Sequence, residues 1–262
     1  MFAAPYPACD GRRAGMRVRG NVQRPALLVI VRHAESARNQ AKKGSVYFAD
    51  DAARRVVRGT PDHQIELSAD GHKQAAETGL AIRDRFGIFD YVYTSGYERT
   101  VRTAEGILSA YPPEERERMK VRMNIFIRER DPGYAYDMTQ DEAEAAFPWL
   151  NEYWRTFGGF MARPPGGESL ADVVARVHTF LSTLFRDRAG QKVLVVTHGG
   201  TIRCFRFALE RWGYPQAERW PPGQSPANCG VTVYRCASSG DRLELEEYNR
   251  IYWTVGSSED GR

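Results

Sequence analysis

Three short runs of apolar, β-branched and aromatic residues recur along the chain, at residues 27–31, 90–94 and 192–197. Runs of this length and composition are typical of strands that are buried on both faces of a sheet. A segment with helical spacing follows the second and third runs, at residues 97–110 and 201–212. The repeated order of strand, loop and helix predicts a wound α/β sheet.

Two further helices and two further strands complete the predicted sandwich. Residues 68–86 and 169–185 place apolar side chains at helical spacing, and Ser68 is a suitable N-cap for the first of them. Apolar and polar residues alternate along residues 231–236 and 243–248, as expected for a pair of strands that close the sheet. We therefore expect an α/β three-layer sandwich, in which helices flank a mostly parallel wound sheet.

The length of 262 residues suits one large domain. Proline and glycine cluster at residues 111–113, 163–167 and 220–223, but each cluster is short and lies between periodic segments, as in loops of one domain. We expect a single domain over residues 26–262. Residues 1–25 hold five arginines and no apolar stretch typical of a secretory signal, which predicts a flexible basic N-terminal tail with a faint resemblance to an organellar transit peptide.

The net charge of +4 comes from arginines spread along the chain. This pattern fits a phosphorylated small-molecule substrate better than nucleic acid, and the chain has no apolar run long enough to cross a membrane. The four cysteines have neither zinc-ligand spacing nor the density of a secreted scaffold, so we expect reduced thiols and a cytoplasmic location. Cys204 is expected to pack inside a helix. The oligomeric state stays open, with a homodimer among the options.

The first apolar run ends directly on Arg32 and His33. Ligands of open parallel sheets bind beyond the carboxyl ends of the strands, so this pair stands where chemistry is usually done. Arginine offers a permanent cation with a planar donor fork, and histidine can act as a base, a nucleophile or a metal ligand. The alternative is a polar loop in which His33 caps a helix or pairs with a surface carboxylate.

The later strands end on further reactive groups. Arg99 stands in the first turn of the helix after the second run, and His198 follows the third run directly. Helix amides at that position also favour anions. If the strand ends converge, two arginines and two histidines form a site for a dianion. The expected pocket residues are Arg32, His33, Ser36, Asn39, Arg99 and His198.

These residues fall into motifs that arrive in a recognisable order over roughly residues 26 to 250. The motifs that resemble the histidine phosphatase superfamily, also called phosphoglycerate mutase-like, are Arg32-His33-Ala34-Glu35-Ser36, Thr94-Ser95 with Arg99 and Thr103-Ala104, Gly167-Glu168-Ser169, and Thr197-His198-Gly199. The resemblance implies the phosphoglycerate mutase-like fold and a phosphohistidine intermediate formed when His33 attacks phosphorus. It implies no metal and no cofactor.

The same resemblance assigns roles to the other residues. It implies that Arg32, Arg99 and His198 stabilise the phosphoryl oxygens. Substrate binding would also involve Ser36, Asn39 and Gly199.

The resemblance further implies that Glu129 is the general acid for the leaving oxygen. A carboxyl that faces a bound dianion has a raised pKa, which suits it to donate a proton and then accept one from water. The competing interpretation is that Glu129 pairs with Arg128 or Arg130 on a solvated loop. Asp131 and Asp137 are the fallback donors.

The chain departs from its family at several positions. Ala34 stands where many members have glycine. The residues around Ser95 also differ from the more frequent family motif, which leaves the role of Ser95 open. The mutases follow the acidic residue with Arg-His-Tyr-Gly, whereas this chain has Arg130-Asp131-Pro132-Gly133. Because a mutase must exclude water, this loss favours hydrolysis and a likeness to the cofactor-independent phosphatase-like members.

We therefore predict a metal-independent phosphomonoesterase. The alternatives are mutase-type phosphoryl transfer, a phospholigand-binding protein with little turnover, and a His/Glu metallohydrolase. The pocket walls are expected from residues 40–62 and 132–166, whose aromatic residues either stack on a substrate or fill the core. Arg54, Arg55 and Arg58 either grip a distal anion of the substrate or form a solvated helix face.

Overall fold

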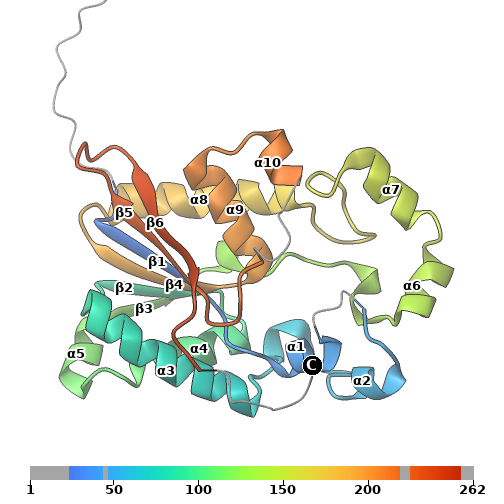
Figure 1. Cartoon of the computed structure of the whole chain (residues 1–262), viewed down its shortest axis with the longest axis horizontal. Coiled ribbons are helices and arrows are strands. Elements are labelled where there is room, and N and C mark those ends of the chain that lie inside the picture. The colour runs from blue at the N-terminus through green and yellow to red at the C-terminus, as the bar shows by residue number, and fades with distance from the viewer. Residues whose placement is uncertain (1–23, 44–46, 219–224, 255–262) are drawn as a thin grey trace, which may run out of the picture.

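A central sheet dominates the computed structural model, which describes residues 24–43, 47–218 and 225–254 (Figure 1). Within these residues six strands pair in the order β3-β2-β4-β1-β5-β6. The first four of that order run parallel to one another, and β5 and β6 are antiparallel additions at one side. The predicted mostly parallel sheet is confirmed. The strands span Leu27–Arg32 (β1), Tyr91–Thr94 (β2), Lys120–Met123 (β3), Lys192–Thr197 (β4), Val231–Cys236 (β5) and Leu243–Arg250 (β6).

Helices cover both faces of this sheet, as the three-layer prediction requires (Figure 1). On one face α3 (Ala69–Phe86) packs closely against α4 (Glu98–Leu108), because a Cβ at Gly79 would lie only 2.6 Å from the backbone oxygen of Ile107 and glycine leaves that space free. On the other face α8 (Leu170–Asp187) lies beside α9 (Gly199–Glu210). The predicted N-cap of α3 is confirmed, since Ser68 accepts a hydrogen bond from the backbone of Gly71 at 3.0 Å.

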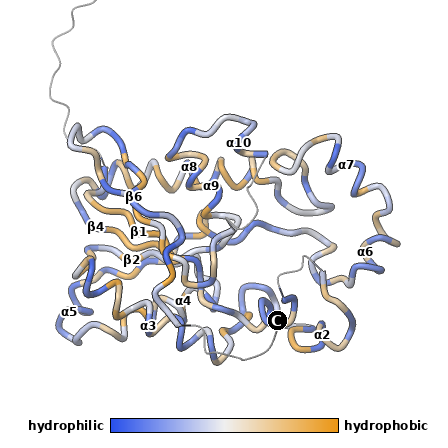
Figure 2. The backbone as a smooth tube through the Cα atoms, in the orientation of Figure 1, coloured by the Kyte–Doolittle hydropathy of each residue, from blue (hydrophilic) through white to orange (hydrophobic). Residues whose placement is uncertain are grey.

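The core explains why the strands are continuous apolar runs. In β1, Leu28 and Ile30 belong to the cluster under α8 and α9, while Val29 and Val31 belong to the cluster over α3 and α4. All four side chains are fully buried. Successive residues of a strand point to opposite faces, so a strand covered on both sides has no polar position. Figure 2 shows this apolar centre in orange.

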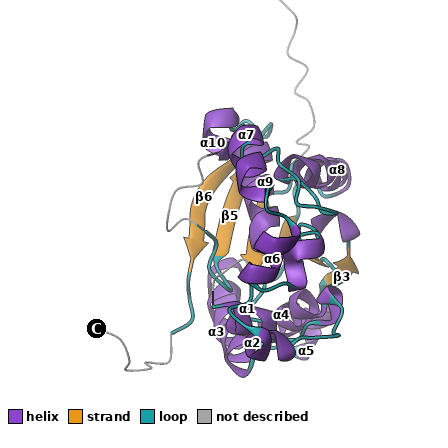
Figure 3. Ribbon diagram, turned by 90° about the vertical axis from the view of Figure 1, so that its right-hand side faces the viewer, coloured by secondary structure: helices purple, strands orange, loops and turns teal. Residues whose placement is uncertain are grey.

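Short helices gather at the end of the sheet where β1 and β4 finish (Figures 1 and 3). Their bounds are Ala37–Lys42 (α1), Asp51–Arg55 (α2), Gln140–Ala146 (α6) and Leu150–Phe157 (α7), with single turns at Asp62–Gln64 (η1), Ile125–Ile127 (η2) and Tyr134–Asp137 (η3). Of these, α2, α6, α7 and η3 lie within the two long segments that were expected to form the pocket walls. A helix was considered there only around Arg54 and Arg55, which belong to α2. The remaining helices are α5 (Pro113–Arg118) and α10 (Tyr214–Glu218).

Three other expectations concern the chain outside the sheet. Cys204 is fully buried in α9, as predicted. Nearly all of the predicted basic tail lies outside the described residues. Among the residues that are described, every helix is too short or too polar to cross a bilayer.

Candidate active site

Parallel pairing of β1 with β4 brings the two histidines together. Arg32 is the register partner of Thr197, so the next residue on each strand, His33 and His198, leaves the sheet at the same point. The backbone N–H of His33 donates to the carbonyl of Thr197 at 2.8 Å, and the two imidazole centroids lie 5.2 Å apart. The predicted convergence of these strand ends is what the structure shows.

His33 presents one ring nitrogen for chemistry. Its Nδ1 donates to the carbonyl oxygen of Ala34 at 2.7 Å, and because a carbonyl can only accept, the proton must be on Nδ1. The lone pair of Nε2 is therefore available. Burial, together with the charges of Arg99 and Arg32, lowers the pKa of His33 well below its usual value. The imidazole stays neutral at neutral pH, which is the form that can act as a nucleophile.

His198 is fully buried behind His33 and is oriented by hydroxyl groups. Its Nε2 lies 2.9 Å from the Oγ of Ser95, whose oxygen is also 3.0 Å from the hydroxyl of Thr100. The Thr100 hydroxyl donates to the carbonyl of Tyr97, which leaves the Ser95 hydroxyl to donate to Thr100 and to accept from His198. This contact supplies the role for Ser95 that the sequence left open.

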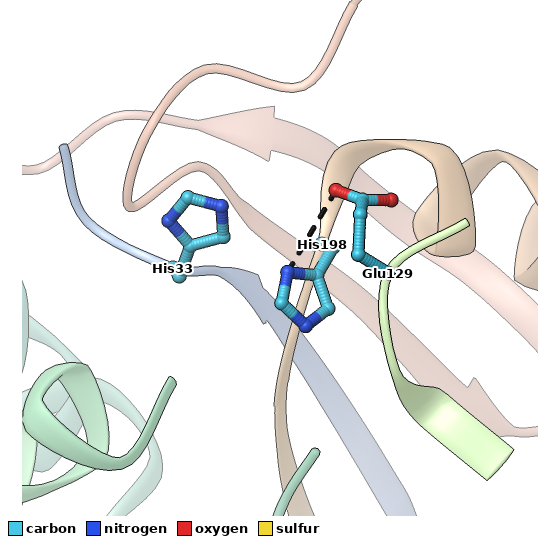
Figure 4. Close-up of side chains that lie close together, drawn as sticks. All are labelled: His33, Glu129 and His198. Atoms are coloured by element: carbon cyan, nitrogen blue, oxygen red, sulfur yellow. Dashed lines mark ion pairs between the residues drawn. The ribbon is translucent and has the colours of Figure 1, made fainter. Parts of the chain in front are cut away.

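The other ring nitrogen of His198 faces Glu129. Nδ1 of His198 has no hydrogen-bond partner within the described structure and lies 3.7 Å from Oε2 of Glu129 (Figure 4). Burial, followed by the charge of Arg99, lowers the pKa of His198 well below its usual value. An incoming dianion would oppose that shift, because a nearby negative charge favours the protonated imidazole.

Glu129 points into the site and forms no ion pair with its arginine neighbours. Its Oε1 accepts from the backbone N–H of Arg130 at 2.9 Å, and Arg128 binds Glu168 at 2.7 Å instead. Burial raises the pKa of the Glu129 carboxyl, partly opposed by Arg99. The structure thus has the inward-facing carboxyl that was expected, and the alternative of a solvated pair is wrong for this side chain.

Arg176 of α8 holds the segment that carries Glu129. Its guanidinium donates to the carbonyls of Phe126, Arg128 and Glu129 at 2.8 to 3.0 Å, and to both carboxylate oxygens of Glu168 at 3.0 Å. Sequence reasoning missed Arg176, and it used Glu168 only as part of a motif. The one available signal was a charged residue on the buried side of a helix, where charges are rare unless they are paired.

Arg99 is 4% exposed and is held by a second acidic residue that the sequence analysis missed. Its Nη1 donates to the backbone carbonyl of Asp62 at 2.7 Å, and its two Nη atoms each lie 3.2 Å from a carboxylate oxygen of Asp62. The hydroxyl of Tyr136 donates to the same carboxylate. A bidentate pair of this kind fixes the plane of a guanidinium. Asp62 comes from η1, far from Arg99 in sequence, and no local pattern pointed to it.

Arg32 completes the cationic side of the site. Its Nη1 donates to the carbonyl of Pro226 at 2.6 Å, while its buried Nε has no partner in the described residues. A Cβ at Gly199 would lie 3.6 Å from that Nε, so glycine keeps the space beside it open. Gly199 is the first residue of α9, whose free N-terminal amides favour anions. Together these groups can hold the oxygens of a phosphoryl group.

A cavity of about 670 Å³ opens over these side chains. Of the residues expected at the site, His198 lies just behind this cavity and the others line it, namely Arg32, His33, Ser36, Asn39, Arg99, Glu129 and Gly199. Ser36 caps α1, and its Oγ donates to Oδ1 of Asn39 at 2.8 Å. Asn39 also lies 3.4 Å from the amide nitrogen of Asn228.

Other candidates lie away from the cavity. The fallback acids Asp131 and Asp137 do not line it, and Asp137 lies 3.5 Å from Arg38. Arg54 forms ion pairs with Asp51 and Glu142, and Arg55 and Arg58 are likewise outside the cavity lining. Among the aromatic residues expected in the walls, Tyr136 lines this cavity.

The donor atoms of His33, Glu129 and His198 lie within 4.8 Å of one another, which raises the question of a metal site. The surroundings suit an anion instead. Burial lowers the pKa values of both imidazoles, and Arg99 and Arg32 beside them lower these values further. The positive potential of the two arginines also opposes the binding of a cation. The electrostatic surroundings of these three residues therefore favour a phosphoryl group over a divalent metal.

Comparison with known proteins decides the family. The profile of the histidine phosphatase superfamily (branch 1) matches residues 28–249. The chain belongs to this superfamily. The resemblance inferred from the ordered motifs is thereby confirmed.

Relatives within the family include mutases and mutase-like proteins. A phosphoglycerate mutase-like protein of Arabidopsis thaliana is 29% identical over 259 residues, covering 90% of this chain and 83% of the relative. A 2,3-bisphosphoglycerate-dependent phosphoglycerate mutase of Rhizobium etli is 31% identical over 233 residues, covering 88% of this chain and 99% of the relative.

Solved structures share the fold of this family member. A mycobacterial glucosyl-3-phosphoglycerate phosphatase in complex with inorganic phosphate superposes with a TM-score of 0.63 at 22% identity, covering 86% of this chain and 97% of that one. The alpha-ribazole phosphatase of Shigella flexneri superposes with a TM-score of 0.65 at 19% identity, covering 88% of this chain and all of that one. At these identities the likeness establishes the three-layer fold.

The hydrogen bonds of Arg176 hold the segment that carries Glu129, and a substitution of Arg176 tests how much they stabilise the protein. Arg176→Met removes every donor to three backbone carbonyls and to Glu168, so we expect the free energy of unfolding to fall by about 3 kcal/mol or more. Urea denaturation measures this change. The matched control is Arg186→Met in the same helix, because Arg186 is exposed and pairs with its neighbour Asp187. Equal stability of the two variants would contradict the role given to Arg176.

Proposed function

We propose that this histidine phosphatase superfamily member hydrolyses a phosphorylated small molecule through a phosphohistidine intermediate. The observation that supports this most is the state of His33. Its Nδ1 proton is committed to the Ala34 carbonyl, its pKa is lowered, and its free Nε2 lies in a cavity lined by Arg32 and Arg99. A neutral, oriented imidazole between two guanidiniums is suited to attack a phosphorus atom.

The proposed reaction has two displacements. In the first, Nε2 of His33 forms a bond to phosphorus while the bond from phosphorus to the ester oxygen breaks, and protonated Glu129 gives its proton to that oxygen. In the second, the Glu129 carboxylate takes a proton from water as the water oxygen attacks phosphorus and the bond from phosphorus to nitrogen breaks. The raised pKa of Glu129 suits both steps, because the carboxyl keeps its proton to a higher pH than usual and can donate it and then accept one.

The remaining groups act on the phosphoryl oxygens. Arg32 and Arg99 are fixed by Pro226 and Asp62, so little reorganisation is needed when charge shifts in the transition state. The start of α9 at Gly199 adds backbone donors on one side. His198, when protonated by the approach of the dianion, can donate from Nδ1 to an oxygen.

Phosphoryl transfer to a second hydroxyl is the other candidate, since the Rhizobium etli relative is named a 2,3-bisphosphoglycerate-dependent phosphoglycerate mutase. Hydrolysis is favoured here because the Arg-His-Tyr-Gly stretch that follows the acidic residue in mutases is replaced by Arg130-Asp131-Pro132-Gly133. Release of inorganic phosphate from phosphoglycerate, in place of isomer formation with added bisphosphoglycerate, separates the two.

The nucleophile is tested with His33→Ala. We expect this variant to lose hydrolysis of p-nitrophenyl phosphate and to form no acid-labile phosphoprotein when incubated with radiolabelled phenyl phosphate. The control is His178→Ala, because His178 is exposed on α8 and should behave as wild type. Turnover retained by a folded His33→Ala protein would rule out the assignment. A wild-type protein that binds phosphate yet forms no covalent adduct would instead be a phospholigand-binding protein.

The general acid is tested with Glu129→Gln. We expect kcat/KM to fall by about 100-fold or more for an alkyl phosphate and far less for p-nitrophenyl phosphate, whose leaving group needs little protonation. In wild type, kcat/KM for the alkyl phosphate should decline as pH rises through the raised pKa of Glu129, because the proton is then lost. The variant should lack this alkaline decline. Exposed Glu152→Gln is the control, and equal losses on both substrates would argue against proton donation by Glu129.

Metal independence is also part of the proposal. The reaction above routes no step through a cation, and the potential at the site opposes one. We expect dialysis against EDTA to leave hydrolysis of p-nitrophenyl phosphate unchanged within about twofold. Loss of activity that zinc or manganese restores would favour a metallohydrolase built on His33, Glu129 and His198.

A cytoplasmic location is likewise proposed. Three cysteines within the described residues, Cys204, Cys229 and Cys236, are free thiols. Reduced thiols are the usual state in a cytosolic protein.

A further inference from the structure

Three separate segments of the chain meet at the carboxylate of Asp62, beside the active site. Arg99 comes from α4, Tyr136 from η3 and Arg38 from α1, and each places a polar group against this carboxylate. All three of these side chains line the cavity, whereas Asp62 does not. The carboxylate thus lies behind the site, in contact with side chains that form it.

The two arginines compete for this carboxylate. Arg99 has both Nη atoms 3.2 Å from the Asp62 oxygens, while Nε of Arg38 lies 3.9 Å from Oδ1 of Asp62. That Nε is buried and has no hydrogen-bond partner within the described residues. A buried donor without an acceptor costs free energy. A rotation of the carboxylate toward Arg38 would therefore satisfy this donor and weaken the pair with Arg99.

Tyr136 opposes that rotation in two ways. Its hydroxyl donates to Oδ1 of Asp62, the oxygen that faces Arg38. Its ring lies against the guanidinium of Arg38, with 3.8 Å between Cζ and the ring centroid, and this contact holds Arg38 in place. Burial and the charge of Asp62 raise the pKa of the Tyr136 phenol, so the hydroxyl keeps its proton and remains a donor.

We propose that Tyr136 is a positioning residue for phosphoryl transfer, which acts through Asp62 to hold the guanidinium of Arg99 in the plane that the phosphoryl oxygens require. This inference rests on the proposed function and extends it to the cavity wall at η3. Arg99 stabilises charge that develops on the phosphoryl oxygens, so a loss of its orientation lowers kcat more than it changes KM.

Tyr136→Phe tests the hydroxyl, because this variant keeps the ring against Arg38. We expect kcat for p-nitrophenyl phosphate to fall by about tenfold, with KM within about threefold of wild type, since a misplaced catalytic group loses mainly transition-state stabilisation. The matched control is Tyr134→Phe in the same turn. Tyr134 is 72% exposed, so this variant should keep the wild-type kcat.

Variants of Asp62 show whether Tyr136 acts through this carboxylate. Asp62→Ala removes the side-chain acceptor of both Arg99 and Tyr136, and we expect kcat to fall by about tenfold or more. Asp62→Asn keeps one acceptor oxygen and should retain more of kcat than Asp62→Ala does. Adding Tyr136→Phe to Asp62→Ala should lower kcat by less than about a further twofold, because the hydroxyl has then lost the group through which it acts.

Three results would overturn the proposal. They are a wild-type kcat in Tyr136→Phe, an equal loss of kcat in Tyr134→Phe, and full additivity of Tyr136→Phe with Asp62→Ala. A substitution that only destabilised η3 would give the third result, because its cost would be the same with or without the Asp62 carboxylate.

Binding of orthovanadate separates this inference from the proposed function. A wild-type protein that releases no phosphate and forms no acid-labile phosphoprotein would remove the proposed hydrolysis. Isothermal titration calorimetry with orthovanadate would still report on the orientation of Arg99. We expect its dissociation constant to rise by about tenfold in Tyr136→Phe and to stay within about twofold in Tyr134→Phe. An unchanged dissociation constant in Tyr136→Phe would overturn the positioning role, whatever the turnover.

Discussion

The pairing of β1 with β4 is the interaction on which the rest of this structure depends. Their register sets Arg32 opposite Thr197, and this places His33 against His198 at the end of the sheet. A slip of one residue would turn every side chain of β1 to the other face, so the two buried clusters that hold β1 also hold the register. The apolar core therefore determines where the reactive groups stand.

The two guanidiniums of the site act on both the histidines and the substrate. Burial lowers the pKa of both histidines and Arg99 and Arg32 lower it further, so the imidazoles stay neutral, and the same two guanidiniums attract a dianion. Buried cations are costly unless they are bound, and each is bound without being fully neutralised. Pro226 supplies only a carbonyl to Arg32, and Asp62 shares its carboxylate between Arg99 and Tyr136.

The walls of the cavity come largely from segments other than the two strand ends that hold the histidines. The three-layer fold is shared with solved structures at about 20% identity. The cavity walls come in part from the segments around α1 and η3, and from Arg130 and Arg203. Connecting segments of this kind vary more within a fold than its sheet does, so we expect the cavity walls to set the specificity.

The amino-acid sequence alone was enough to predict five of the six described strands, the large helices and the order of the reactive groups, because apolar periodicity and strand-end motifs are local signals. The exposed edge strand β3 has no such apolar signal and was not predicted. His33, Arg99 and His198 were found from these local signals, whereas Glu129 was identified through the resemblance to the family. Only the tertiary structure revealed Asp62 beside Arg99, Arg176 beneath Glu129, and the hydroxyl chain from Ser95 to His198. Those contacts join residues far apart in the chain, and a polar side chain gives no local sign of the distant partner that it will meet.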